Sequence, residues 1–315
     1  MISVFLGAGF SLLGGVPLAS QLFDKQPLVD VISRESLIES VLGGWWDWNH
    51  QKGGTPEEYL AYLEATPGKH WFAAVRYVAL VVTLGMHRVS IGGQRPTITH
   101  HSLNLAPRIK EHEDFWTTIF RRTTDVCVLT TNYDILAERG LRLKPKPQIP
   151  RPGFHYGEGP EKLKGRLSGI FHSRSLNAEG TVPLLKLHGS VSWSLSGNRI
   201  DRYHDCRPAI RGDAAIIAPV TEKSVPSVFQ PIWDHAASVL AKSDTWIIVG
   251  YSFPEYDEAV GKLFQSAAKH GTRVHIMNPD PKAFHRARSL FKEAEVLSHQ
   301  GIPEALDDLP NILGN

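Results

Sequence analysis

The chain has 315 residues, of which 42% are hydrophobic and 21% are charged, and its formal net charge is +2 at pH 7. This length suffices for one large or two modest domains at about 150 residues each. The near balance of charge gives no bulk electrostatic indication of nucleic-acid binding. The 15 His are scattered, two Cys are too few for a disulfide framework, and the absence of any C-x-x-C argues against a zinc ribbon.

The N-terminal stretch MISVFLGAGF is apolar, but no Lys or Arg precedes it and glycines interrupt it. We therefore do not expect a signal peptide. The longest apolar run, Tyr77 to Met86, is far shorter than the roughly 20 residues that a membrane span requires. A reducing cytoplasm is the expected location.

Apolar runs of strand length recur along the chain and end in Gly, Asn, His or Pro. In chain order they are ISVFLGAG from Ile2, VCVLTTN from Val126, LLKLHG from Leu184, AIIAP from Ala215, TWIIVGYS from Thr245 and RVHIMNP from Arg273. Most of the runs are continuous rather than alternating, which is typical of parallel strands buried on both faces. Helical patterns lie between them, clearest at 226–242, 256–270 and 281–291. The alternation predicts an α/β doubly wound, Rossmann-like parallel sheet.

Two stretches interrupt this alternation. Residues 25–95 read as a helical insertion that contains Trp45, Trp46 and Trp48, with long helices across 57–89. We expect these Trp side chains to pack the helices onto the core, and a partner-binding surface is the alternative. Residues 141–182 are rich in Pro, Gly, Lys and Arg and predict an extended connection. We expect the whole chain, 1–315, to be one catalytic domain that carries this insertion.

Polar residues follow four groups of predicted strands, at the sheet edge where open α/β sheets bind ligands. In FLGAGFS, glycines allow close approach to a phosphate, with free N–H groups facing it, although a plain strand-to-helix turn is the alternative. In VCVLTTNYD, Asn132 or Asp134 can simply cap the following helix. His188 ends LLKLHG, where a lone His is more often structural. Ser252 and Asn278 can serve as a cap and a turn residue.

Taken together, the motifs resemble those of the sirtuin-like superfamily in identity, order and position. They are GAGxS followed by G-V-P, then TTNYD, KLHGS, GYSFPEYD and NP, and they span residues 5–279. TTNYD with KLHGS looks like a bacterial, zinc-less branch rather than the protein-deacylating sirtuins. The resemblance implies NAD as the bound molecule.

The resemblance also implies roles for individual residues. The catalytic pair would be Asn132 and His188, with His188 beside the ribose hydroxyls. The NAD-binding residues would be Gly7, Ala8, Gly9 and Ser11 at the pyrophosphate, Thr131 and Asp134 at the nicotinamide ribose, and Gly250, Ser252 and Asn278 at the phosphate and adenosine end. These residue types suit the chemistry, since cleavage of the nicotinamide–ribose bond expels a neutral leaving group and needs no strong acid.

The chain departs from the deacylating sirtuins at two places. Leu18, Ala19 and Ser20 stand where those enzymes carry Asp, Phe and Arg, and the stretch after His188 holds one Cys instead of four zinc ligands. We therefore expect no zinc ribbon, no metal and no peptide groove, so that water becomes the acceptor. The expected activity is hydrolysis of NAD to ADP-ribose and nicotinamide, and the resemblance implies a role in antiphage defence.

Three other functions are alternatives. An NAD-dependent protein deacylase would need an acyl-lysine peptide, and a non-catalytic sensor would bind NAD or ADP-ribose without turnover. A classical oxidoreductase is disfavoured because Leu12 occupies the last position of the glycine fingerprint. Because unrestrained NAD hydrolysis would be toxic, we expect a regulatory partner protein or a homo-oligomer. We expect neither membrane nor direct nucleic-acid binding.

Overall fold

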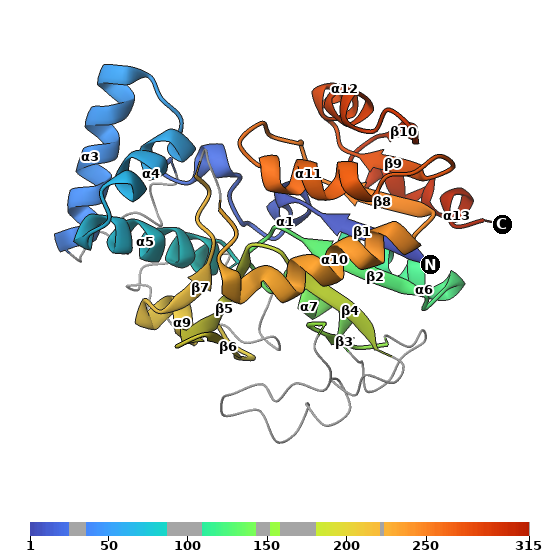
Figure 1. Ribbon diagram of the computed structural model, residues 1–315, viewed down its shortest axis with the longest axis horizontal. Helices are drawn as coiled ribbons and strands as arrows, with labels where there is room; N and C mark the ends of the chain where they lie inside the picture. The colour runs from blue at the N-terminus through green and yellow to red at the C-terminus, as the bar shows by residue number, and fades with distance from the viewer. Residues whose placement is uncertain (25–35, 87–108, 143–151, 158–180, 221–223, 315) are drawn as a thin grey trace.

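The computed structural model describes residues 1–24, 36–86, 109–142, 152–157, 181–220 and 224–314. Within these residues, seven parallel strands form the central sheet in the order β10-β9-β8-β1-β2-β4-β3 (Figure 1). The strands are β1 (Ile2–Leu6), β2 (Val126–Thr130), β3 (Phe154–His155), β4 (Val182–Lys186), β8 (Thr245–Val249), β9 (Arg273–Met277) and β10 (Glu295–His299). The chain leaves β1 toward β2 and later returns to β8 on the other side, so the topological switch lies between β1 and β8.

Burial explains why these segments pair in parallel. Val4 of β1 aligns with Val128 of β2 and with Ile247 of β8, and every residue of β2 and β8 is buried. Strands without a solvent-facing side read as continuous apolar runs. The predicted doubly wound α/β fold is confirmed, and five of the six apolar runs contribute strands to this sheet.

The run at 215–219 is the exception. Its strand β7 (Ala214–Ile216) pairs with β5 (Gly189–Ser196), which also pairs with β6 (Arg199–Arg202), and both pairings are antiparallel. Expecting this run beside the parallel strands was therefore wrong. A short run buried under a neighbouring helix looks the same in sequence as a central parallel strand, and the pattern of β5 and β6 was not recognised.

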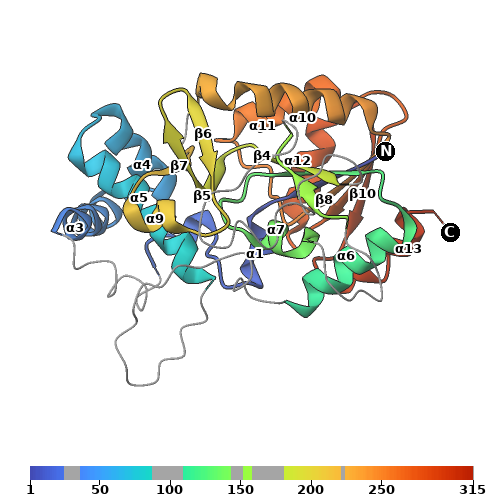
Figure 2. The ribbon, with the colours of Figure 1, turned by 90° about the horizontal axis from the view of Figure 1, so that it is seen from below.

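Helices cover both faces of the central sheet (Figures 1 and 2). The helices α10 (Gln230–Lys242) and α11 (Glu258–Ala267) lie on one face, and α6 (Lys110–Arg122), α7 (Leu136–Leu141) and α13 (Leu309–Ile312) on the other. The remaining elements are α1 (Ala8–Leu12), α9 (Arg207–Arg211), α12 (Pro281–Leu290) and the 3-10 turns η1 (Ala19–Gln21), η2 (Ser227–Phe229) and η3 (Glu304–Leu306). The three helices expected after residue 225 are thus present, with shifted ends.

The helical insertion forms a second hydrophobic cluster beside the three-stranded sheet. It consists of α3 (Ser36–Lys52), α4 (Pro56–Ala65) and α5 (Lys69–Gly85), and Trp45 stacks on Phe23 in its interior. Trp46 is instead 63% exposed, so the packing expected of the Trp residues holds for Trp45 but not for Trp46. Parts of the expected insertion and of the connection at 141–182 lie outside the described residues.

The most apolar helix, α5, is enclosed by protein. All residues from Tyr77 to Gly85 are buried, and the helix contacts α3 and α4 together with β5, β7 and α9. None of the helices that the structure describes combines the length and hydrophobicity needed to cross a bilayer.

A buried ion pair lies beneath the exits of β2 and β4. Lys186 and Glu138 are both fully buried, with Nζ 3.1 Å from Oε1. Lys186 Nζ also donates to the backbone oxygen of Asp134, and the Tyr156 hydroxyl donates to Glu138. Burial raises the pKa of Glu138, and the neighbouring Lys186 opposes that rise. The pair therefore connects α7 to β4.

Replacing Lys186 by Met should destabilise the protein by about 3–5 kcal/mol, because it leaves a buried carboxylate without its counter-charge. Urea unfolding would measure the change. The matched control is Lys262→Met, which removes an exposed pair with Glu258 and should cost no more than about 1 kcal/mol. Equal effects of the two substitutions would contradict this account of Lys186.

Candidate active site

A cavity of about 800 Å³ opens at the carboxyl ends of the parallel strands, next to the switch between β1 and β8. This is the edge at which open α/β sheets bind ligands. The turn after β1, the exits of β2, β4, β8 and β9, and the helical insertion all contribute to its lining. The predicted site residues that line it are Ala8, Gly9, Ser11, Thr131, Asn132, Asp134, His188, Gly250, Ser252 and Asn278. Gly7 precedes Ala8 and is not among the lining residues.

Three glycines bring the turn after β1 into contact with the loop after β8. The amides of Gly7 and Gly9 donate to the oxygens of Val249 and Gly250, each at 2.9 Å. A Cβ on Gly7 would lie 2.6 Å from the Cα of Tyr251, and one on Gly9 would lie 2.8 Å from that of Gly250. The expectation that these amides are free to face a phosphate is therefore wrong for Gly7 and Gly9. Glycine is required at both positions because the two backbones pack closely.

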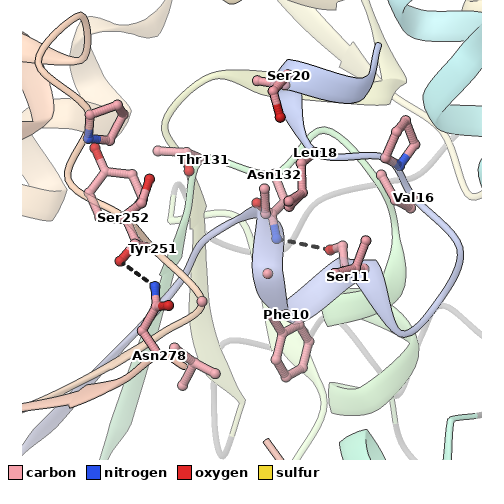
Figure 3. A pocket seen from close by; sticks show the side chains of 18 of the residues that line it. Phe10, Ser11, Val16, Leu18, Ser20, Thr131, Asn132, Tyr251, Ser252 and Asn278 are labelled. Atoms are coloured by element: carbon pink, nitrogen blue, oxygen red, sulfur yellow. Dashed lines mark hydrogen bonds between the residues drawn. The ribbon is translucent and has the colours of Figure 1, made fainter. Parts of the chain in front are cut away.

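Asn132 has a fixed side-chain orientation at the exit of β2 (Figure 3). Its Nδ2 donates to the oxygen of Gly7 at 2.8 Å and to Oγ of Ser11 at 2.9 Å. A carbonyl can only accept, so the bond to Gly7 identifies this atom as the amide nitrogen. Both amide protons are then used. The Oδ1 oxygen is the atom of Asn132 that remains to accept a hydrogen bond from a molecule in the cavity.

His188 follows β4 and lies opposite a carboxylate. Its Nε2 is 3.3 Å from Oδ1 of Asp257, and both side chains are almost completely buried. Asp257 in turn accepts a hydrogen bond of 2.9 Å from the Tyr251 hydroxyl. Burial, followed by the charge of Asp257, raises the pKa of Tyr251 far above its usual value. Tyr251 therefore stays a neutral donor to Asp257, and the Asp257 carboxylate lies close to the imidazole of His188.

Asp134 makes a local hydrogen bond before α7 and also belongs to the cavity lining. Its Oδ1 accepts from the amide of Leu136 at 2.9 Å, but the N-cap residue of α7 is Ile135, which has no side-chain cap. Asp134 therefore fixes the turn before the helix rather than serving as its N-cap, and it lines the cavity together with Thr131. Asn132 makes no such bond to α7, and its contacts run to the turn after β1 instead.

The opposite end of the cavity lies at the exits of β8 and β9. Asn278 Nδ2 donates to the oxygen of Tyr251 at 3.0 Å (Figure 3), and its Oδ1 accepts from the amide of Asp280 at 3.0 Å. Arg286 of α12 donates to the oxygen of Ser252 at 3.1 Å. Asn278 and Arg286 therefore hold the loop after β8 in place from the adjacent strand and helix.

The lining residues that were not identified as site residues from the sequence include Tyr251, Asp257, Arg286 and Glu57. A signal existed for two of them, because Tyr251 and Asp257 lie within the motif GYSFPEYD. Arg286 lies on the outer helix α12, and Glu57 lies on α4 of the insertion, far from every strand end. Neither position could be inferred from the strand pattern.

The comparison with protein families gives a match that agrees with this geometry. Residues 126–297, more than half of the chain, match the family model of the SIR2-like domain. The chain therefore belongs to the SIR2-like domain family. Among the residues that the structure describes, no group of three or more His, Cys, Asp or Glu is placed to hold a metal ion.

Solved Sir2 structures also resemble the chain, each over 99% of its length. A serine-to-alanine mutant of a Sir2 homologue in complex with ADP-ribose is 16% identical, with 90% of that chain covered and a TM-score of 0.43. A Sir2 complex with a p53 peptide and NAD+ is 13% identical, with 92% covered and a TM-score of 0.40. These values are too low to transfer an activity or a residue's role. No curated protein matches the sequence.

Substituting Gly250 by Ala should destabilise the protein more than the same change at Gly271. Both glycines have positive φ, +63° and +89°, but a Cβ on Gly250 would lie 2.4 Å from the amide nitrogen of Phe10, whereas one on Gly271 would meet open space. The left-handed conformation alone costs a non-glycine residue roughly 1–2 kcal/mol. Chemical unfolding should therefore give about that loss for Gly271→Ala and clearly more for Gly250→Ala. Equal losses would mean that the loops can separate freely.

Proposed function

We propose that this protein is an NAD+ glycohydrolase, which cleaves the nicotinamide–ribose bond with water to give ADP-ribose and nicotinamide. The observation that carries the proposal is the orientation of Asn132, whose amide protons are bound by Gly7 and Ser11. Its Oδ1 can then accept from a ribose hydroxyl or from the attacking water. His188 lines the same cavity, so an acceptor and a base are available at one place.

In this proposal the extended NAD molecule lies along the carboxyl edge of the sheet. The pyrophosphate would lie over the turn of Gly7, Ala8, Gly9 and Ser11, and the adenosine over Gly250, Ser252 and Asn278. Thr131 and Asp134 would contact the nicotinamide ribose beside Asn132 and His188. The continuous lining from the β2 exit to the β9 exit supports this placement.

The reaction breaks the bond between C1 of the ribose and the pyridinium nitrogen, and the bonding electrons leave with neutral nicotinamide. Positive charge develops on the ribose, as in glycoside hydrolysis. The oxygen of water then forms the new bond to C1, and one proton is released. His188 would accept that proton, held in position by Asp257 at 3.3 Å, before passing it to solvent.

Water is the acceptor that the chain's own residues favour. The segment after His188, in which the deacylating sirtuins hold a zinc module, folds into β5, β6 and α9 instead. Cys206 is buried within this segment, and burial raises the pKa of its thiol. We therefore place the protein in the zinc-less branch of the family and treat deacylation as the alternative.

We also propose, from the resemblance, that the hydrolase serves as an effector of bacterial antiphage defence. Such an activity must be restrained until it is needed. The helical insertion offers a surface for a regulatory partner or a second copy, since Trp46 and Phe72 are 63% and 69% exposed on it. The helical insertion would then be a regulatory part of a single catalytic domain that spans residues 1–315.

Incubation of the purified protein with NAD+ alone tests the activity, with nicotinamide and ADP-ribose followed by chromatography. We expect both products from the wild type. Asn132→Ala should lower turnover at least about 10²-fold, and His188→Ala about 10²- to 10⁴-fold. The matched controls are the exposed residues Asn198→Ala and His270→Ala, which should leave turnover unchanged.

The products distinguish the alternatives. Release of O-acyl-ADP-ribose only in the presence of an acyl-lysine peptide would establish deacylation instead. Binding of NAD+ by calorimetry without any product, with or without such a peptide, would favour a sensor. A folded Asn132→Ala variant that retains most activity would refute the assignment of the reaction to this site.

A further inference from the structure

Glu57 brings a carboxylate from the helical insertion into the cavity. It lies in the first turn of α4, is only 5% exposed, and belongs to the cavity lining. The positive end of the helix dipole in this turn favours a negative charge. No other acidic residue of the insertion reaches the cavity among the residues described.

Two tyrosines lie near the Glu57 carboxylate. The Tyr256 hydroxyl donates a hydrogen bond to the Glu57 carboxylate, and burial together with this carboxylate raises the pKa of Tyr256. The pKa of Tyr133 is raised by burial and then by the nearby Asp257, Tyr256 and Glu57. Tyr133 directly follows Asn132 in the chain, and Asp257 contacts His188. Glu57 therefore shares the cavity with Asn132 and His188, and Tyr133 and Tyr256 lie near its carboxylate.

Within the described residues, no Lys, Arg or His forms an ion pair with Glu57. A buried carboxylate is costly unless its charge is compensated, and one phenol supplies only a single neutral donor. The Glu57 carboxylate can therefore accept further hydrogen bonds or pair with a positive charge. It lines a cavity whose proposed occupant carries a cationic pyridinium. A cationic occupant would compensate the part of this charge that the helix dipole and one phenol leave uncompensated.

We propose that Glu57 is a catalytic residue of the NAD+ hydrolysis, which stabilises the positive charge of the nicotinamide riboside in the bound substrate and in the transition state. The inference rests on the proposed function. During the reaction this charge moves from the pyridinium ring to the ribose, and a fixed carboxylate beside both groups lowers the barrier without needing to take a proton. The proton still passes to His188.

A purely structural role for Glu57 predicts different behaviour. If Glu57 served only to hold Tyr256, then Tyr256→Phe, which removes the hydrogen bond but keeps the charge, should be more harmful than Glu57→Gln. Glu57→Gln keeps an oxygen that accepts from Tyr256 and removes only the charge. Comparing the two substitutions therefore separates the effect of the Glu57 charge from the effect of its hydrogen bond with Tyr256.

The first test compares kcat/KM for NAD+ hydrolysis. Glu57→Gln should lower it about 10²-fold, Glu57→Asp should recover part of the loss, and Tyr256→Phe should stay within a few-fold of the wild type. Glu64→Gln, at the exposed far end of the same helix, should change nothing. Wild-type-like activity of Glu57→Gln, or equal losses for Glu57→Gln and Tyr256→Phe, would overturn the inference.

The second test does not require turnover. Calorimetry would compare NAD+ with NADH, whose nicotinamide ring is uncharged, on Asn132→Ala with and without Glu57→Gln. Removing the carboxylate should weaken NAD+ binding at least about tenfold and leave NADH binding unchanged. Equal effects on both nucleotides would refute the role of charge. This comparison decides whether Glu57 recognises the cation even where the isolated wild type, restrained without its partner, does not hydrolyse NAD+.

Discussion

The backbone contact between Gly7, Gly9 and Gly250 is the constraint on which the rest of the site depends. It closes the floor of the cavity at the switch between β1 and β8, since the amides of the first turn donate directly to carbonyls at the end of β8. The oxygen of Gly7 accepts from Asn132 and also from the amide of Phe10. One close approach of two loops thus also determines how the residue at the exit of a third strand, β2, is oriented.

Backbone carbonyls fix many of the polar side chains around this floor. Asn132 is bound by Gly7, Asn278 by the oxygen of Tyr251, and Lys186 by that of Asp134. Carbonyls of a packed sheet edge move little, so these side chains are held before any ligand arrives. Such preorganisation is what stabilisation of a short-lived cation requires, because reorienting dipoles during the reaction would cost part of the gain.

The strand pattern predicted the sheet well because central parallel strands must be apolar along their whole length. It predicted the edge less well: β10 at Glu295–His299 carries polar residues and exposed positions, and β7 belongs to the antiparallel sheet. The motifs predicted which strand ends meet at the cavity, since the topology of an open sheet brings them together. They could not reveal Glu57, because the packing of an insertion against the sheet edge depends on tertiary contacts that no local pattern encodes. They also suggested free amides at Gly7 and Gly9, but these amides donate to the oxygens of Val249 and Gly250.

The two hydrogen bonds that Asn132 donates have a consequence for the choice of small molecules. Since its nitrogen donates to Gly7 and Ser11, the side chain can offer a ligand only its oxygen, which accepts hydrogen bonds. A ligand with a hydroxyl or an amine at this point can donate to that oxygen. An ether, a fluorine or a carbonyl placed there would be repelled, because both groups are hydrogen-bond acceptors. If the protein acts on NAD+ as proposed, analogues methylated on one ribose oxygen at a time would show which hydroxyl group Asn132 contacts.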